Sequence, residues 1–65
     1  RLDLQQAMQV LSANERLCIT LQLVDGQSIE QIAAITGMAQ GTIKSHLSRG
    51  KNKLTAYLKQ NGYDG

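Results

Sequence analysis

The sequence predicts a small all-α domain of four helices with no sheet. Apolar residues recur at spacings of three and four in four separate segments, which is the pattern of amphipathic helices. No segment alternates between apolar and polar residues for long enough to form a strand. At 65 residues the chain has room for one domain, so the four helices must share a single core.

The first two helices are predicted over residues 2–11 and 13–24. In the first, Leu4, Ala7, Met8 and Leu11 fall on one face. The second begins at a capping box, in which Ser12 and the glutamate three residues later each accept a hydrogen bond from the other's backbone N–H. It is expected to end at Asp25-Gly26, since glycine readily adopts the left-handed conformation of a helix stop.

The second predicted helix has two apolar faces. The face expected in the core contains Leu17, Leu21 and Val24, with Thr20 among them. Ile19 and Leu23 form another apolar edge, which either packs on the first helix or faces a partner protein. Met8 in the first helix and Cys18 in the second are interpreted as packing residues.

Residues 29–60 have the pattern of a helix-turn-helix, which predicts a winged-helix-like three-to-four-helix bundle that binds DNA or RNA. Ser28 and Gln31 repeat the capping-box spacing before a short helix over 29–36. Gly37 suits the turn, and a long helix over 39–60 follows. A plain helical hairpin inside a larger bundle is the alternative. The side chains predicted to be buried across the domain are Leu17, Leu21, Ile32, Ala33, Ile43, Leu47 and Leu54.

Charge is distributed unevenly along the chain. Residues 1–43 carry two basic and four acidic side chains, whereas residues 44–63 carry five basic side chains and no acidic one. An excess of positive charge on one segment is typical of a protein that binds an anionic partner, most often nucleic acid.

The long helix carries this charge on the face opposite its apolar stripe. Amide and basic side chains can hydrogen-bond base edges, and cations further along suit phosphates. A charged, solvated surface is the alternative interpretation, and His46 is expected to lie at the boundary of the core. The predicted DNA-binding residues are Gln40, Thr42, Lys44, Ser45, Ser48, Arg49, Lys51 and Lys53.

Several other classes of function are not supported by the sequence. Cys18 and His46 are the only cysteine and histidine, so neither a disulfide nor a zinc site of the usual kind is expected, and no cofactor is predicted. The single histidine lies on the helix-turn-helix, which argues against an enzyme. No apolar run approaches the roughly 18 residues of a membrane span. We therefore expect a cytoplasmic domain, and its start at Arg1 suggests a piece of a longer chain.

Three runs of sequence resemble region 4 of bacterial sigma factors in the sigma-70 family, particularly the extracytoplasmic-function class. The runs are LSANER (11–16), DGQSIEQIA (25–33) and GMAQGTIKSHLSRGK (37–51). The last is the most specific, because it follows the family pattern at most positions without a gap. The chain departs from that pattern at Ser12, Gln22, Thr36 and Ala39, where proline, a basic residue, leucine and a capping serine are more common.

Two alternatives to a promoter-binding sigma domain stay open. The effector domain of LuxR-type response regulators also resembles the GTIKSHL run, and His46 favours it, whereas the SRGK run at 48–51 favours the sigma factor. A region-4-like module that acts mainly in protein interaction is the second alternative. The loss of a capping hydroxyl at Ala39 favours that module, and the basic helix face favours DNA binding.

The resemblance implies a domain that reads the −35 element of promoters with its last helix in the major groove. It implies that residues 1–65 form region 4, that a region 2 precedes Arg1, and that Thr42 and Lys51 contact the DNA backbone. The implied protein partners are core RNA polymerase, through the flap of its β subunit, and an anti-sigma factor that competes for the same domain.

Overall fold

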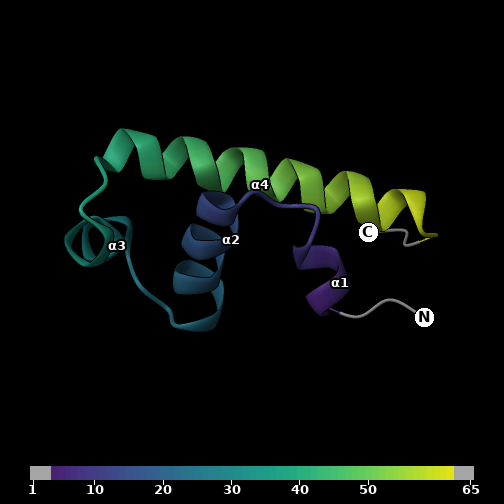
Figure 1. Cartoon of the computed structure of the whole chain (residues 1–65), viewed down its shortest axis with the longest axis horizontal. Helices are drawn as coiled ribbons and strands as arrows, with labels where there is room; N and C mark the ends of the chain where they lie inside the picture. The colour runs from purple at the N-terminus through teal and green to yellow at the C-terminus, as the bar shows by residue number, and fades with distance from the viewer. Residues whose placement is uncertain (1–3, 63–65) are drawn as a thin grey trace.

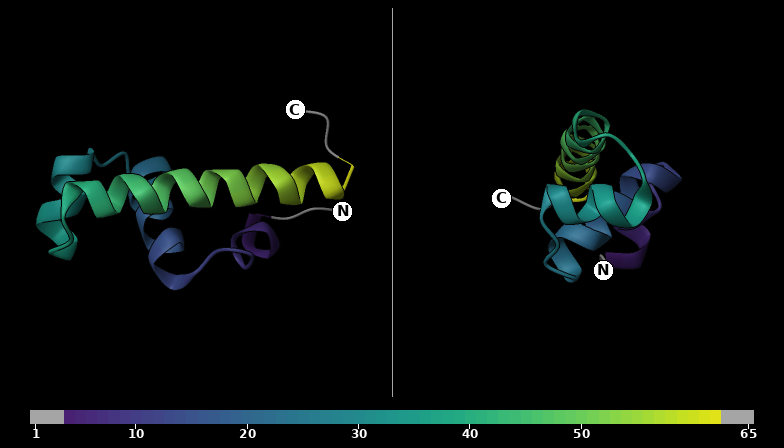
Figure 2. Two further views of the ribbon diagram at one scale, coloured as in Figure 1. Left: turned by 90° about the horizontal axis from the view of Figure 1, so that it is seen from above. Right: turned by 90° about the vertical axis from the view of Figure 1, so that its left-hand side faces the viewer.

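A computed structural model describes residues 4–62 as α1 (Leu4–Met8), α2 (Ala13–Ile19), the π-helix η1 (Thr20–Val24), α3 (Ile29–Thr36) and α4 (Gln40–Gln60). No strand occurs within these residues, which agrees with the predicted all-α fold class. The molecule measures 37 × 19 × 18 Å, and α4 runs along the longest axis. The other helices all lie on one side of α4, so its opposite side is uncovered (Figure 1; Figure 2).

α1 is shorter than predicted. Residues 2 and 3 of the predicted helix lie outside the described residues, and the helix ends at Met8 rather than at residue 11. Backbone bonds between residues three apart then carry the chain to Leu11, which is buried. The physical reason is the next element: Ser12 must be extended, at φ −67° and ψ 166°, in order to cap α2.

The predicted capping box at the start of α2 is confirmed. The Ser12 hydroxyl accepts from the Glu15 N–H at 3.2 Å, and the Glu15 carboxylate accepts from the Ser12 N–H at 3.0 Å. The α-helix does not continue to Val24, however, because residues 20–24 widen into η1, in which the Asp25 N–H donates to the Thr20 carbonyl. A π-helical turn is a rare element that often marks a functional region.

The predicted core face of the second helix is wrong for Leu17 and Val24, although Leu21 packs against the core. Leu17 and Val24 are 43% and 67% exposed, and the side chains that face the core are Cys18, Ile19 and, at the helix start, Glu15. Of the second apolar edge, Ile19 enters the core, where it packs against Gly50 of α4, whereas Leu23 stays 62% exposed. Cys18 is confirmed as a packing residue, since it is fully buried and burial raises the pKa of its thiol.

The helix-turn-helix agrees with the prediction. The Ser28 hydroxyl accepts from the Gln31 N–H, the Gln31 side chain accepts from the Ser28 N–H, and Gly37 ends α3 at φ 76°. Thr36 stabilises the turn by accepting from the Met38 N–H while it donates to the Ile32 carbonyl. α4 begins without a side-chain cap, as the alanine at position 39 implies.

One hydrophobic cluster joins α2, α3 and α4 with the segment that follows α1. Leu11, Cys18, Ile19, Ile32, Ile43 and Leu47 are buried in it. Burial is therefore confirmed for Ile32, Ile43 and Leu47, whereas Leu21, Ala33 and Leu54 pack against the cluster but keep part of their surface exposed.

Gly50 fixes how closely α2 can lie on α4. A Cβ atom at this position would clash with Cδ1 of Ile19 and lie 3.3 Å from Cγ1 of the same side chain. Ile19 is only 2% exposed, so it has little room to move. The absence of a side chain at Gly50 thus allows Ile19 into the core and sets the position of α4.

Candidate DNA-binding surface

The exposed face of α4 contains every residue predicted to contact DNA. Ile43, Leu47 and Gly50 hold the opposite face in the core. Gln40, Thr42, Lys44, Ser45, Ser48, Arg49, Lys51 and Lys53 are all exposed. Their contact with DNA remains a prediction. Lys53 lies beside α2, where it pairs with Glu15, and Lys44, Ser48 and Lys51 border η1 and α3.

The start of α4 is open to an anion. Ala39 is extended and its side chain accepts no hydrogen bond, so it leaves the first-turn N–H groups without the partner that a serine would supply. Gln40, Gly41 and Thr42 are exposed there. The positive end of the helix dipole favours negative charge at this point, which is consistent with the predicted backbone contact of Thr42.

Lys53 differs from the other cations of this face because it is held by an ion pair. Its Nζ lies 2.8 Å from Oε1 of Glu15 at the start of α2. That carboxylate is 5% exposed, and the hydrogen bond from Lys53 lowers its pKa, as does the bond from the backbone N–H of Ser12. Among residues 4–62, Lys44, Arg49 and Lys51 make no such pair, so their charges are more available to a ligand than that of Lys53.

Two polar atoms near α4 are enclosed without a hydrogen-bond partner. They are Nδ1 of His46 and Oε1 of Gln22. His46 is half-buried, which confirms its predicted position at the boundary of the core. Gln22 lines a hollow of 340 Å³ between η1, the start of α3 and α4, and Lys44, Ser48 and Lys51 line the same hollow.

Sequence reasoning missed Gln22 as a candidate site residue. It lies outside the helix that carries the basic face, and only the folded chain brings it beside that face. The one signal was the departure already noted, an amide where the resembling family commonly has a basic residue.

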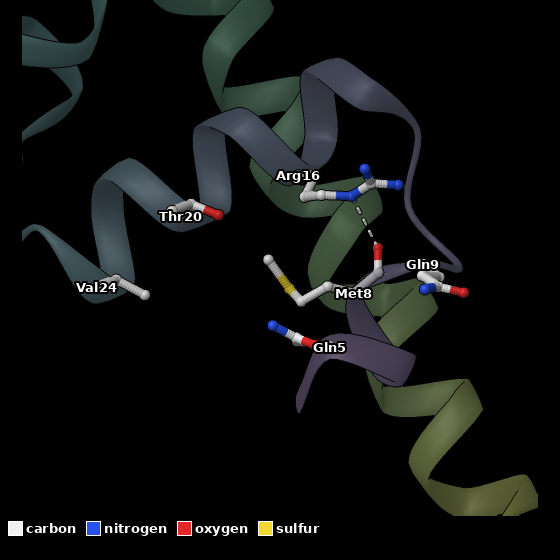
Figure 3. A pocket seen from close by; sticks show the side chains of 6 residues that line it. All are labelled: Gln5, Met8, Gln9, Arg16, Thr20 and Val24. Atoms are coloured by element: carbon white, nitrogen blue, oxygen red, sulfur yellow. Dashed lines mark hydrogen bonds between the residues drawn. The ribbon is translucent and has the colours of Figure 1, made fainter. Parts of the chain in front are cut away.

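A second, wider groove lies on the other side of the second helix. It has a volume of 460 Å³ and is lined by residues of α1 and of the α2–η1 segment, among them Met8, Arg16 and Val24 (Figure 3). The Arg16 guanidinium donates to the carbonyl oxygens of Met8 and Leu11, both at 3.2 Å. This side chain therefore fastens the end of α1 to α2 and forms one wall of the groove.

Comparison with known proteins identifies the family. The family described as "Sigma-70, region 4" matches residues 1–54. The chain belongs to this family. The match therefore favours the sigma-factor interpretation over the LuxR-type one.

Two curated relatives of this region 4 domain are themselves named as sigma factors. The ECF RNA polymerase sigma factor SigE of Mycolicibacterium smegmatis is 38% identical over 56 residues, which cover 86% of this chain and 22% of the relative. The ECF RNA polymerase sigma factor EcfG of Rhodopseudomonas palustris is 38% identical over 60 residues, which cover 92% of this chain and 33% of the relative. The chain thus spans a third or less of each relative. Among the described residues, no helix is both long and apolar enough to cross a bilayer.

Proposed function

We propose that this domain recognises the −35 element of promoter DNA during transcription initiation, which would place it in the cytoplasm. The observation that carries the proposal is the uncovered face of α4, where Lys44, Arg49 and Lys51 lie among short polar side chains with no acidic residue on the helix. Membership of the region 4 family and the names of the two sigma-factor relatives support it.

The residues of the face have two roles in this proposal. Gln40, Lys44, Ser45, Ser48 and Arg49 face bases or the nearest phosphates, because they follow one another along the outward side of the helix. Thr42, Lys51 and Lys53 contact the DNA backbone, and Lys53 contributes less because Glu15 already neutralises part of its charge.

Paired substitutions on α4 test the division of roles. Arg49→Ala should weaken binding to a preferred promoter duplex more than to a random duplex, whereas Lys51→Ala should weaken both equally and lower the salt slope by about one. Lys59→Ala is the matched control, because this exposed lysine lies in the last turn of the same helix. Fluorescence anisotropy across a salt series measures both quantities. Equal losses on both duplexes for Arg49→Ala would remove base reading from the proposal.

We further propose that the outward side of α2 and η1 binds core RNA polymerase at the flap of the β subunit. Leu17, Leu23 and Val24 of these two elements are 43%, 62% and 67% exposed. Ile19 is not available to this surface because it is buried in the core. An anti-sigma factor that covers the same three side chains would block assembly with the polymerase.

A binding assay with the isolated β flap tests the polymerase surface. Leu23→Glu should abolish binding, because a carboxylate in an apolar interface loses its hydration without gaining a partner. Ile35→Glu is the control, since Ile35 is a similarly exposed apolar residue, 58% exposed, on α3. Equal binding by the two variants would show that the flap does not use this surface.

A domain used mainly for protein interaction is the second candidate function. The exposed apolar side chains of the second helix and the uncapped start of α4 favour it. Salt titration of binding to random duplex DNA separates the two functions, because a DNA-binding domain loses affinity steeply as salt increases. A flat salt response together with tight binding to a protein partner would favour the second.

A further inference from the structure

The hollow beside the basic face combines positive charge with hydrogen-bond donors from two parts of the chain. Lys44, Ser48 and Lys51 come from successive turns of α4, Gln22 comes from η1, and the apolar side chains of Ile29 and Leu47 complete the wall. None of these six lining residues is acidic. At 340 Å³ the hollow is far larger than the roughly 10–15 Å³ that a site needs in order to hold one water molecule, so it has room for a phosphodiester group.

The two polar atoms of the Gln22 amide differ in their surroundings. Its Oε1 is enclosed without a hydrogen-bond partner, which is an unfavourable state for a polar atom. The Nε2 atom is not enclosed in this way, and the side chain makes no hydrogen bond with any residue in 4–62. The N–H groups of Nε2 are thus left without an acceptor in the described chain, and Gln22 lines the hollow.

We propose that this hollow holds one phosphate of the DNA backbone, with Gln22 as a DNA-contacting residue outside the recognition helix. Lys44 and Lys51 supply the charge, and the Ser48 hydroxyl and the Gln22 amide donate hydrogen bonds to the phosphate oxygens. The inference rests on the proposed DNA-binding function and adds a contact to it. Because phosphate contacts fix the orientation of a protein on the duplex, Gln22 would help to set how deeply α4 enters the major groove.

The test is a double-mutant cycle on affinity for a mixed-sequence duplex of about 20 base pairs, a length that includes several phosphates on each strand. Gln22→Met keeps the length of the side chain but removes its donors, and it should weaken binding on the order of tenfold. Lys51→Met should weaken binding as well. If the two residues share one phosphate, the double variant should lose less than the product of the two single losses. Arg49→Met supplies the control cycle, because Arg49 does not line the hollow and its loss should combine independently with that of Gln22→Met.

Thermal unfolding distinguishes a DNA contact made by Gln22 from a purely structural role of this residue. Gln22→Met removes the enclosed, unpartnered Oε1, so the melting temperature should stay the same or rise while DNA affinity falls. Should that variant fail to fold, Gln22→Glu repeats the test by placing a carboxylate against the phosphate, with Gln9→Glu beside α1 as the control for added charge. Wild-type affinity in Gln22→Met, or equal losses in Gln22→Glu and Gln9→Glu, would overturn the inference and leave DNA binding intact. Binding by the unaltered chain that does not depend on salt would overturn both the inference and the proposed function.

Discussion

At Gly50 the backbone of α4 lies directly against the Ile19 side chain. A methyl group there would meet Ile19 at its Cδ1 and Cγ1 atoms, and the Cβ of Glu15 at 3.5 Å. The same stretch of α2 thus supplies both an apolar contact and the ion pair with Lys53. The region 4 domain depends on these two contacts to hold α2 across the middle of α4.

Gly50→Ala should destabilise the domain by about 1–3 kcal/mol, because the added methyl group overpacks a buried contact. In an exposed helix interior the same substitution should instead stabilise by about 0.5–1 kcal/mol. Gly41→Ala provides that control, since Gly41 lies in α4 and a Cβ there would meet no atom within 4 Å. Denaturant unfolding of both variants measures the difference. A Gly50→Ala variant as stable as Gly41→Ala would contradict the packing described here.

Glu15 should make the stability of the domain depend on pH in the acid range. The hydrogen bonds from Lys53 and from the Ser12 N–H lower the pKa of the folded carboxyl below its ordinary value of 4.5. The unfolded chain therefore binds this proton first as pH falls. The stability that this group contributes is fully present above pH 4.5 and is lost as pH falls through the folded pKa.

Denaturant unfolding across this pH range checks the prediction. It compares the free energy of unfolding of the wild type with that of Glu15→Gln at each pH. The two should differ near neutral pH and converge in acid, because glutamine does not titrate. Glu30→Gln is the control, since the carboxylate of Glu30 is exposed and makes no ion pair among residues 4–62. A constant difference between wild type and Glu15→Gln at all pH values would show that the ion pair does not act through titration.

The helices show which features of the fold follow from local sequence. The capping boxes of α2 and α3 and the stop at Gly37 could be predicted because each depends on residues within one turn of the chain. The orientation of α2 could not be predicted in this way. Its sequence contains two apolar faces, and neither is buried as a whole: Gly50, from a distant part of the chain, admits Ile19 to the core, while Leu17, Leu23 and Val24 stay exposed.

The candidate site also has features that could be predicted from local sequence and features that could not. The exposed face of α4 could be predicted from the periodicity of one helix, and its residues are where that periodicity places them. The hollow that contains Gln22 could not be predicted from the sequence, because its walls come from three elements. The ion pair of Lys53 was also missed, since its partner belongs to another helix.

Ala39→Ser should stabilise the start of α4. Ala39 already has the extended conformation of an N-cap, at φ −66° and ψ 148°, so a hydroxyl could accept a first-turn N–H without a change of backbone. The expected gain is about 0.5–2 kcal/mol in the free energy of unfolding. Thr42→Ser is the control, because it retains a hydroxyl at a helical position that is not the cap. No gain in Ala39→Ser would indicate that the first-turn N–H groups already have another partner.

The shape of the whole molecule limits how it can bind DNA. The proposed DNA-binding face lies on one helix, α4, on one side of a domain of 37 × 19 × 18 Å, and the exposed apolar side chains of Leu17, Leu23 and Val24 lie on the second helical segment. One helix reads about one half-site. A second binding surface, as proposed for α2 and η1, would give the domain a way to be held near a DNA site by another protein.

We accordingly expect the 65-residue chain to bind DNA weakly alone and tightly only within a larger assembly. Among residues 4–62, Lys44, Arg49 and Lys51 are the unpaired cations of the proposed DNA-binding face, because Lys53 is paired with Glu15. So few phosphate contacts should give a dissociation constant in the non-specific range of roughly 10⁻⁴–10⁻⁶ M at physiological salt. Tethering to polymerase should raise the apparent affinity about 10²–10⁴-fold through effective concentration, without any new contact to DNA. Anisotropy with a promoter duplex, on the chain alone and in complex with the polymerase, measures both values. Nanomolar binding by a two-fold dimer of the isolated chain would contradict this account, because such a dimer would read two half-sites without a tether.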